Sequence, residues 1–207
     1  MIDVEYFFRI LRDQGINNFC GVPDSLLKTL CSYISDNTDK SQHLITANEG
    51  SAVSLAVGHY LSTGNLSLVY MQNSGFGNAI NPLLSLADSR VYGIPMIILV
   101  GWRGEPGVSD EPQHLKQGEV MKKLLDACGL DTFIIDSETK NIPNIIEESV
   151  KLTKATNQPV IILARKDTFG PYKSKNITPN IAQSSRESAI EKILDSSSVE
   201  SDIFVST

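Results

Sequence analysis

The feature that most constrains the fold is a continuous apolar run, Pro95-Met96-Ile97-Ile98-Leu99-Val100. A run without polar alternation is typical of a parallel strand that is buried on both faces. Pro159-Val160-Ile161-Ile162-Leu163 has the same character. Because the connections between parallel strands are usually helical, two such strands predict a sheet that carries helices on both faces.

Short apolar runs alternate with helical patterns along most of the chain. We expect strands at residues 18–21, 43–46, 66–72, 95–100, 132–135 and 159–163. We expect helices between Asp3 and Gly15 and over residues 25–36, 49–63, 78–89, 115–128 and 142–155, with Pro82 in the first turn of the fourth helix. This order predicts an α/β fold with a doubly wound, mostly parallel six-stranded sheet and helices on both faces.

The sequence changes character after the last predicted strand. We expect one domain over residues 1–168 and a polar linker over residues 169–186, which contains Pro171 and Pro179. Helical spacing returns between Arg186 and Leu194, and residues 202–207 have the pattern of a strand. We therefore interpret residues 187–207 as the truncated start of a second domain.

Composition narrows the possible partners and the compartment. The net charge is −6 and the sequence pI is about 5.1, which argues against nucleic acid as the main partner. The three cysteines have neither metal-ligand spacing nor a disulfide framework, which favours a reducing cytoplasm. No apolar run approaches the roughly 20 residues that span a bilayer, so no membrane contact is expected.

One carboxylate stands at the start of an unusually small-residue helix. Glu49 follows the apolar run 44–47, and Ser51, Ala52 and Gly58 keep the helix thin enough for another backbone to approach. Partial dehydration of a carboxylate at such a position disfavours its charged form, which suits a group that transfers protons. The simpler alternative is that Glu49 is an acid in the first turn of the helix, where the helix dipole favours a negative charge.

Polar residues follow four of the predicted strands. The carboxyl ends of parallel strands meet at one edge of a sheet, where ligands bind. The segments expected there are Gly21-Val22-Pro23-Asp24-Ser25, Asn48-Glu49, Gln72-Asn73-Ser74-Gly75-Phe76-Gly77, and residues 101–118. Asp24 or Ser25 could equally be a helix cap in a simple turn.

Other sites are excluded or weighed against simpler alternatives. Gly75-Phe76-Gly77 has two of the three glycines of a dinucleotide fingerprint, and Ile80 stands where that fingerprint needs Gly or Ala. The chain has no phosphate-binding P-loop and no nucleophile elbow. We interpret His43 and His59 as packing or surface residues. His114 lies in the Gly-rich segment after the fourth strand, where a role in a site explains it as well as a packing or surface role does.

Taken together, these segments resemble one family, the thiamine-diphosphate-dependent decarboxylases. Residues 21–27, 48–52, 71–78, 101–105 and 113–118 are similar to phosphonopyruvate decarboxylases, and the resemblance covers about residues 1–166. It identifies residues 1–168 as the domain that binds the pyrimidine ring of thiamine diphosphate. Residues 186–207 resemble the opening of the diphosphate-binding domain.

The resemblance also implies roles for individual residues. Glu49 would hydrogen-bond the aminopyrimidine ring and activate the cofactor, with Gln72, Asn73, Ser74 and Gly75 as further cofactor contacts. Asp24 and His114 would handle protons near the keto group. Ser25, Gln113 and Arg103 would contact the substrate, and Asn73 is a further candidate for its anionic groups. Either Arg103 or Lys116 would favour an anionic tail, although a solvated surface role is the simpler explanation for Lys116.

The implied reaction converts 3-phosphonopyruvate, a small 2-oxo acid of phosphonate biosynthesis, to phosphonoacetaldehyde and CO2. The family binds Mg²⁺ and diphosphate through a Gly-Asp-Gly motif that this sequence lacks. We therefore expect no metal ligand here, an inactive chain on its own, and a second domain or partner subunit that completes the site in a homo-oligomer. The alternatives are a sulfopyruvate decarboxylase alpha-type subunit and a non-catalytic assembly module of the same fold.

Overall fold

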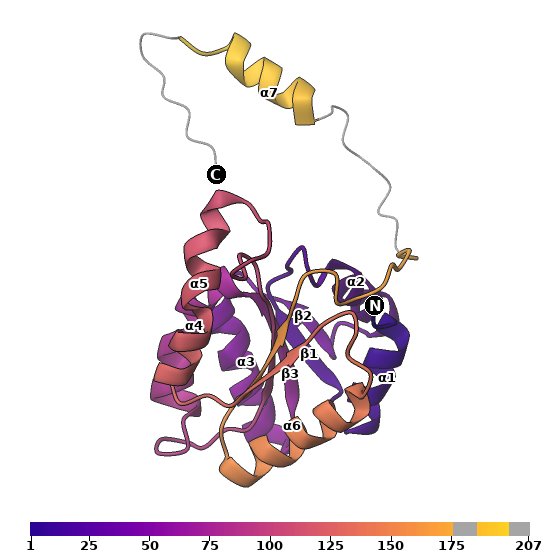
Figure 1. Cartoon of the computed structure of the whole chain (residues 1–207), viewed down its shortest axis with the longest axis vertical. Helices are drawn as coiled ribbons and strands as arrows, with labels where there is room; N and C mark the ends of the chain where they lie inside the picture. Colours follow the sequence, from indigo (N-terminus) through magenta and orange to yellow (C-terminus); the bar gives the residue numbers. More distant parts are fainter. Residues whose placement is uncertain (176–185, 199–207) are drawn as a thin grey trace. The chain divides into compact units, whose positions relative to one another are not determined.

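The computed structural model describes residues 1–175 and 186–198, and its centre is a six-stranded sheet (Figure 1). All of the strand pairs are parallel, in the order β2-β1-β3-β4-β6-β5. The strands are β1 (Asn18–Gly21), β2 (His43–Ile45), β3 (Ser67–Gln72), β4 (Ile97–Gly101), β5 (Thr132–Ile135) and β6 (Val160–Ala164). The predicted α/β fold with its parallel sheet is confirmed.

Helices cover both faces of this sheet (Figure 1). The helical elements are α1 (Val4–Asp13), α2 (Lys28–Asn37), α3 (Glu49–Thr63), η1 (Asn73–Gly75), α4 (Phe76–Pro82), η2 (Leu83–Ala87), α5 (Pro112–Ala127), α6 (Ile142–Thr156) and α7 (Arg186–Asp195). Helices α1, α2 and α6 pack on one face, and α3, α4 and α5 pack on the other. The chain is therefore doubly wound.

The apolar run of β4 explains why two cores form. Ile97 and Leu99 belong to the cluster beneath α1, α2 and α6, whereas Ile98 and Val100 belong to the cluster beneath α3, α4 and α5. Successive side chains of a strand point to opposite faces, so a strand between two helix layers is apolar at every position. All five residues of β4 are buried.

Three helix boundaries differ from the prediction. Helix α2 begins at Lys28 rather than at residue 25, and α5 begins at Pro112 rather than at residue 115. The third difference concerns Pro82, which lies at the end of α4 instead of in a first turn. The helical segment starts earlier, at Phe76, and passes at Leu83 into a π-helical turn. A proline in a helix removes one backbone donor, which accounts for this local change of hydrogen bonding.

The contacts divide the chain into two units, residues 1–174 and 175–207. The predicted helix near Arg186 exists as α7. The strand predicted at residues 202–207 lies outside the described residues, as does most of the predicted linker. In the part of the chain that is described, no helix combines the length and the apolar character that crossing a membrane requires.

Candidate functional site

The carboxyl ends of the central strands form one edge that carries the predicted site residues. Gln72 of β3 is in register with Gly101 of β4, which pairs in turn with Ala164 of β6. On the other side of β3, Gly21 of β1 pairs with Tyr70. The segments that follow these strands therefore start at nearly the same level, as the sequence predicts for a ligand-binding edge.

Glu49 is the first residue of α3 and is only 8% exposed. Asn48 caps the helix, because its side chain accepts a hydrogen bond of 2.9 Å from the Ser51 amide. Asn78 of α4 donates a hydrogen bond of 2.8 Å to Glu49 Oε2. No described residue donates a hydrogen bond to Glu49 Oε1. The carboxylate is thus held by one oxygen and leaves the other available as an acceptor.

Gly75 lies directly against this carboxylate. A Cβ atom at Gly75 would stand 1.9 Å from Glu49 Oε1, so any larger residue there would displace this carboxylate. The short turn η1 brings Gly75 there from the end of β3. Two segments that are 26 residues apart in sequence, and that we predicted to share a cofactor site, therefore meet at the carboxylate of Glu49.

The three residues that precede Gly75 make different contacts. Asn73 is buried, donates a hydrogen bond of 2.8 Å to the Arg103 carbonyl and accepts one of 3.0 Å from the Arg103 amide. Its amide therefore ties the end of β3 to the loop after β4. Gln72 donates a hydrogen bond of 2.7 Å to Ser74 Oγ. The predicted cofactor contacts of these three residues stay predictions.

Asp24 is buried at 5% exposure in the turn after β1. Its Oδ2 accepts a hydrogen bond of 3.1 Å from the Leu26 amide, and its buried Oδ1 has no partner among the described residues. Burial raises the pKa of the Asp24 carboxyl, and the nearby Arg103 charge opposes that rise. A Cβ atom at Gly101 would stand 2.0 Å from Asp24 Oδ2, so glycine at the end of β4 makes room for this side chain.

Arg103 joins the loop after β4 to the turn after β1. It donates a hydrogen bond of 2.7 Å from Nη1 to Ser25 Oγ. Its Nε donates to both carboxylate oxygens of Asp110, at 2.8 and 3.0 Å, and its Nη2 donates to Asp110 Oδ1. Hydrogen bonding with Arg103 holds the pKa of Asp110 well below its usual range. A fork-shaped pair of this kind fixes the guanidinium in one orientation.

A cavity of about 400 Å³ opens beside this pair. Its lining includes Ser25, Arg103, Ser109, Asp110, Glu111 and Lys166. Lys166 comes two residues after β6 and was not predicted as a site residue, because no motif marks that position. Lys116 lies elsewhere: its side chain is 77% exposed and bonds Glu119 at 3.1 Å.

Gln113 and His114 lie in the first turn of α5, not in a loop as predicted. Gln113 is exposed and His114 is half-buried. The helix start packs tightly on the preceding loop, since a Cβ atom at Gly104 would stand 2.0 Å from the His114 carbonyl oxygen. Trp102 also holds α5 against this loop, because its Nε1 donates a hydrogen bond of 3.0 Å to the Gly118 carbonyl of α5. The structure places His114 near Gly104 of the Arg103 loop.

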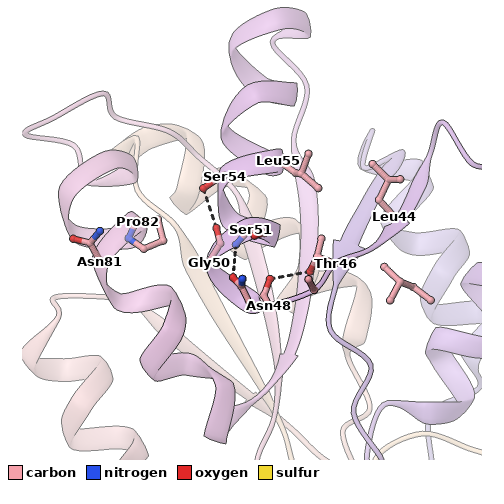
Figure 2. A pocket seen from close by; sticks show the side chains of 11 residues that line it. Leu44, Thr46, Asn48, Gly50, Ser51, Ser54, Leu55, Asn81 and Pro82 are labelled. Atoms are coloured by element: carbon pink, nitrogen blue, oxygen red, sulfur yellow. Dashed lines mark hydrogen bonds between the residues drawn. The ribbon is translucent and has the colours of Figure 1, made fainter.

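A second, larger cavity lies beside the first turns of α3. It measures about 730 Å³, and Figure 2 shows side chains from the end of β2, from α3 and from α4 around it. Asn48 and Gly50, the two neighbours of Glu49, both line it. The 11 lining residues are Leu44, Ile45, Thr46, Ala47, Asn48, Gly50, Ser51, Ser54, Leu55, Asn81 and Pro82, and none of them is charged. We call this cavity the uncharged groove.

The buried carboxylate of Glu49 and the turn at Gly75 lie at the carboxyl edge of a doubly wound sheet, where α/β domains bind their ligands. A protein-family model described as "Thiamine pyrophosphate enzyme, N-terminal TPP binding domain" matches residues 3–133. The chain belongs to the thiamine pyrophosphate enzymes, and the matched part is their N-terminal domain.

The chain is similar to two kinds of curated protein. It is 38% identical to phosphonopyruvate decarboxylase from Streptomyces viridochromogenes over 133 residues, which are 64% of this chain and 32% of that protein. It is 31% identical to sulfopyruvate decarboxylase subunit alpha from Methanococcus maripaludis over 159 residues, which are 77% of this chain and 92% of that subunit. The match therefore spans about a third of the phosphonopyruvate decarboxylases but most of an alpha subunit.

Solved structures show the same fold at lower identity. A thiamine diphosphate-dependent 4-hydroxybenzoylformate decarboxylase from Rhodococcus jostii superposes with a TM-score of 0.57 at 20% identity. The superposition covers 81% of this chain and 31% of that chain. Benzoylformate decarboxylase from Polynucleobacter necessarius gives a TM-score of 0.56 at 18% identity, with 84% and 32% of the two chains covered.

Proposed function

We propose that this chain is the pyrimidine-binding half of a thiamine-diphosphate-dependent decarboxylase that converts 3-phosphonopyruvate to phosphonoacetaldehyde and CO2. In this reaction the bond between the keto carbon and the carboxylate breaks, CO2 leaves, and a proton takes its place on the carbonyl carbon. The observation that carries the proposal is the buried carboxylate of Glu49, held by Asn78 and facing Gly75. The 38% identity to phosphonopyruvate decarboxylase supports the choice of substrate.

The residues around Glu49 fit the pyrimidine ring of the cofactor. Glu49 Oε1 is an acceptor that no described residue occupies, and the absence of a side chain at Gly75 lets the carboxylate lie directly against η1. Glu49 would accept a hydrogen bond from the ring and exchange a proton with it, while Gln72 at the end of β3 and Asn73 and Ser74 of η1 would line the ring. When bound, thiamine diphosphate supplies the electron sink that decarboxylation of a 2-oxo acid requires.

Other side chains would hold the substrate and move its protons. Asp24 is buried, and burial raises the pKa of its carboxyl, which suits a group that donates a proton near the keto group. His114 is half-buried on α5 and is the second candidate for proton transfer. Ser25, Gln113 and Arg103 would contact the anionic groups of the substrate.

The remaining half of the site belongs to another domain or subunit. This chain lacks the Gly-Asp-Gly motif for Mg²⁺ and diphosphate, and the matched phosphonopyruvate decarboxylases are about three times longer than the match. We propose that the diphosphate-binding half docks over the uncharged groove, because interface cores are depleted in charge. Residues 50–87 contain no Asp, Glu, Lys or Arg, although such residues make up 20% of the chain. The assembled protein would be a homo-oligomer, and the free cysteines fit a cytoplasmic location.

One observation favours a second candidate function. The matched region covers 92% of a sulfopyruvate decarboxylase alpha subunit, so the matched part of this chain corresponds to most of such a subunit. Phosphonate and sulfonate are both tetrahedral anions, and the cavity beside Arg103 could accept either. A non-catalytic assembly module is the remaining alternative, and binding of thiamine diphosphate by the assembled protein would exclude it.

The direct test is an assay of the assembled protein with 3-phosphonopyruvate, 3-sulfopyruvate and pyruvate, in the presence of thiamine diphosphate and Mg²⁺. We expect CO2 release with the highest kcat/KM for 3-phosphonopyruvate. A higher kcat/KM for 3-sulfopyruvate would establish the second candidate. Cofactor binding without CO2 release from any of the three acids would contradict the decarboxylase assignment.

A further inference from the structure

The cavity beside Arg103 has the chemistry of an anion site. Its lining includes a guanidinium, an ammonium and two hydroxyls, contributed by Arg103, Lys166, Ser25 and Ser109. These residues come from the segments after β1, β4 and β6, which meet at the carboxyl edge of the sheet. The cavity therefore lies where an α/β protein of this kind binds its ligands.

The hydrogen bonds in this cavity leave a donor free. Ser25 Oγ accepts a hydrogen bond of 2.7 Å from Arg103 Nη1. A serine hydroxyl that accepts a hydrogen bond from a cation can still donate its own O–H hydrogen to another acceptor. Asp110 fixes Arg103 from the other side, so the guanidinium and the hydroxyl keep one relative position. This arrangement suits a tetrahedral anion with several oxygens.

Lys166 is the cation of the cavity that no acid among the described residues pairs with. Its neighbour Arg165 is committed to Glu105 at 2.9 Å and to Asp136 at 3.5 Å. Lys166, in contrast, forms no ion pair with any described residue. The charge of Arg103 is balanced by Asp110, which leaves Lys166 as the uncommitted cation and Glu111 as the uncommitted acid of the lining.

We infer that Lys166 is a specificity-determining residue that, with Ser25 and Arg103, binds the phosphonate or sulfonate group of the substrate. The inference rests on the proposed function for the identity of the ligand, but the anion site itself depends only on this cavity. Asp110 is then a positioning residue that acts through Arg103. Glu111 opposes the anion and limits the affinity, because like charges repel within the same cavity.

The test is a titration of the chain with phosphonoacetate, with acetate as the reference anion, followed by chemical shifts of backbone amides. Removing one solvent-accessible cation from an ion contact costs about fivefold in affinity, so we expect that loss for Lys166→Met. Lys166→Arg should retain binding. Glu111→Gln should bind phosphonoacetate more tightly than the unmodified chain, and higher salt should weaken binding in all variants that retain Lys166.

Lys123→Met is the matched control, because Lys123 is an exposed lysine of α5 outside the cavity and its loss changes the net charge equally. Equal affinities for the Lys166→Met and Lys123→Met variants would overturn the inference, as would no binding of phosphonoacetate to the unmodified chain. A failure of the proposed function would be distinguishable from a failure of this inference. If the assembled protein lacked decarboxylase activity but Lys166→Met still weakened anion binding, only the proposed function would be contradicted.

Discussion

At the scale of single residues, Asp24 is the clearest case of a group whose position reduces stability. Its carboxyl is 5% exposed and has one oxygen without a partner among the described residues. Such a group lowers the stability of the folded protein. Groups of this kind are typical of sites that bind a ligand or carry out a reaction. Burial raises its pKa, which means that the folded state binds the proton of Asp24 more tightly than the unfolded state.

This shift gives a stability prediction with a definite sign. Because the folded pKa is raised, ionisation of Asp24 reduces stability as the pH rises from the ordinary carboxyl pKa to the raised value. Asp24→Asn removes that loss, so we expect the free energy of unfolding to increase at pH 7 by about 0.5–2 kcal/mol. The gain should shrink near about pH 3, where both states carry the proton. Urea unfolding at the two pH values measures it.

Asp126→Asn is the control, since Asp126 is exposed on α5. A lower stability of Asp24→Asn at pH 7, or an equal gain at both pH values, would show that burial of the charge is not the dominant effect. We also expect the assembled Asp24→Asn enzyme to lose activity, because an amide cannot supply the proton.

Site residues that belong to motifs were predictable from the sequence, whereas those defined by partners distant in sequence were not. Glu49 and Gly75 were both named, and the structure places them in contact. Asp110 and Lys166 were not named, because their roles follow from contacts to Arg103 or from a shared cavity. Lys116, which the sequence placed near the site, instead pairs with Glu119 at the surface.

At the scale of secondary-structure elements, the turn η1 is held against the start of α3. Substituting Gly75 by Ala would put a Cβ atom 1.9 Å from Glu49 Oε1, so the carboxylate must move. We expect Gly75→Ala to reduce kcat of the assembled enzyme by about 10²-fold, because misplacement of a catalytic group by an ångström has an effect of that size.

Gly77→Ala provides a matched comparison two residues away. A Cβ atom at Gly77 has no heavy atom within 4 Å, and the position lies in α4, where alanine is favourable. We expect Gly77→Ala to fold at least as stably as the unmodified chain and to retain its kcat. Similar kcat values for both alanine variants would contradict the contact between η1 and Glu49.

The start of α5 is held against the loop that carries Arg103. A Cβ atom at Gly118 would stand 1.7 Å from the Gly104 carbonyl oxygen, and that atom belongs to the backbone, so the loop must shift. We expect Gly118→Ala to lower the free energy of unfolding by about 1–3 kcal/mol. Thermal unfolding of the chain measures this loss. Gly58→Ala in α3 meets nothing within 4 Å and should not be destabilised; equal stabilities of the two variants would refute the tight contact.

The types of the elements were predictable from apolar patterning, whereas several boundaries were not. Each strand was located within two residues, because buried parallel strands leave unbroken apolar runs. The first turn of α5 was predicted as loop, since Pro112, Gln113 and His114 carry no apolar face. Proline is nevertheless favourable at the first position of a helix, and the structure uses it there.

At the scale of the whole molecule, the uncharged groove is the surface that we assign to the diphosphate-binding half. Ile45 is 63% exposed and Leu55 is 42% exposed, and both line the groove. We expect Leu55→Glu to leave the isolated chain folded, because the position is exposed, and to weaken assembly with the other half by at least about tenfold, since a buried unpaired charge is unfavourable at an interface. Sedimentation velocity measures the assembly.

Val91→Glu is the comparison for this experiment. Val91 is also exposed, lies outside the groove, and gives the same change of charge. We expect this variant to assemble normally. If both variants assembled as well as the unmodified protein, the docking surface would have to lie elsewhere on the chain.

The central claim is that Glu49 activates a cofactor shared between this chain and a diphosphate-binding half. The most direct measurement is the rate of CO2 release from 3-phosphonopyruvate by the assembled protein with Glu49 and with Glu49→Gln. Glutamine keeps the shape of the side chain but cannot exchange the proton, so we predict a loss of about 10²–10⁴-fold with unchanged unfolding of the chain. Turnover by Glu49→Gln within a few-fold of the unmodified enzyme would contradict the account.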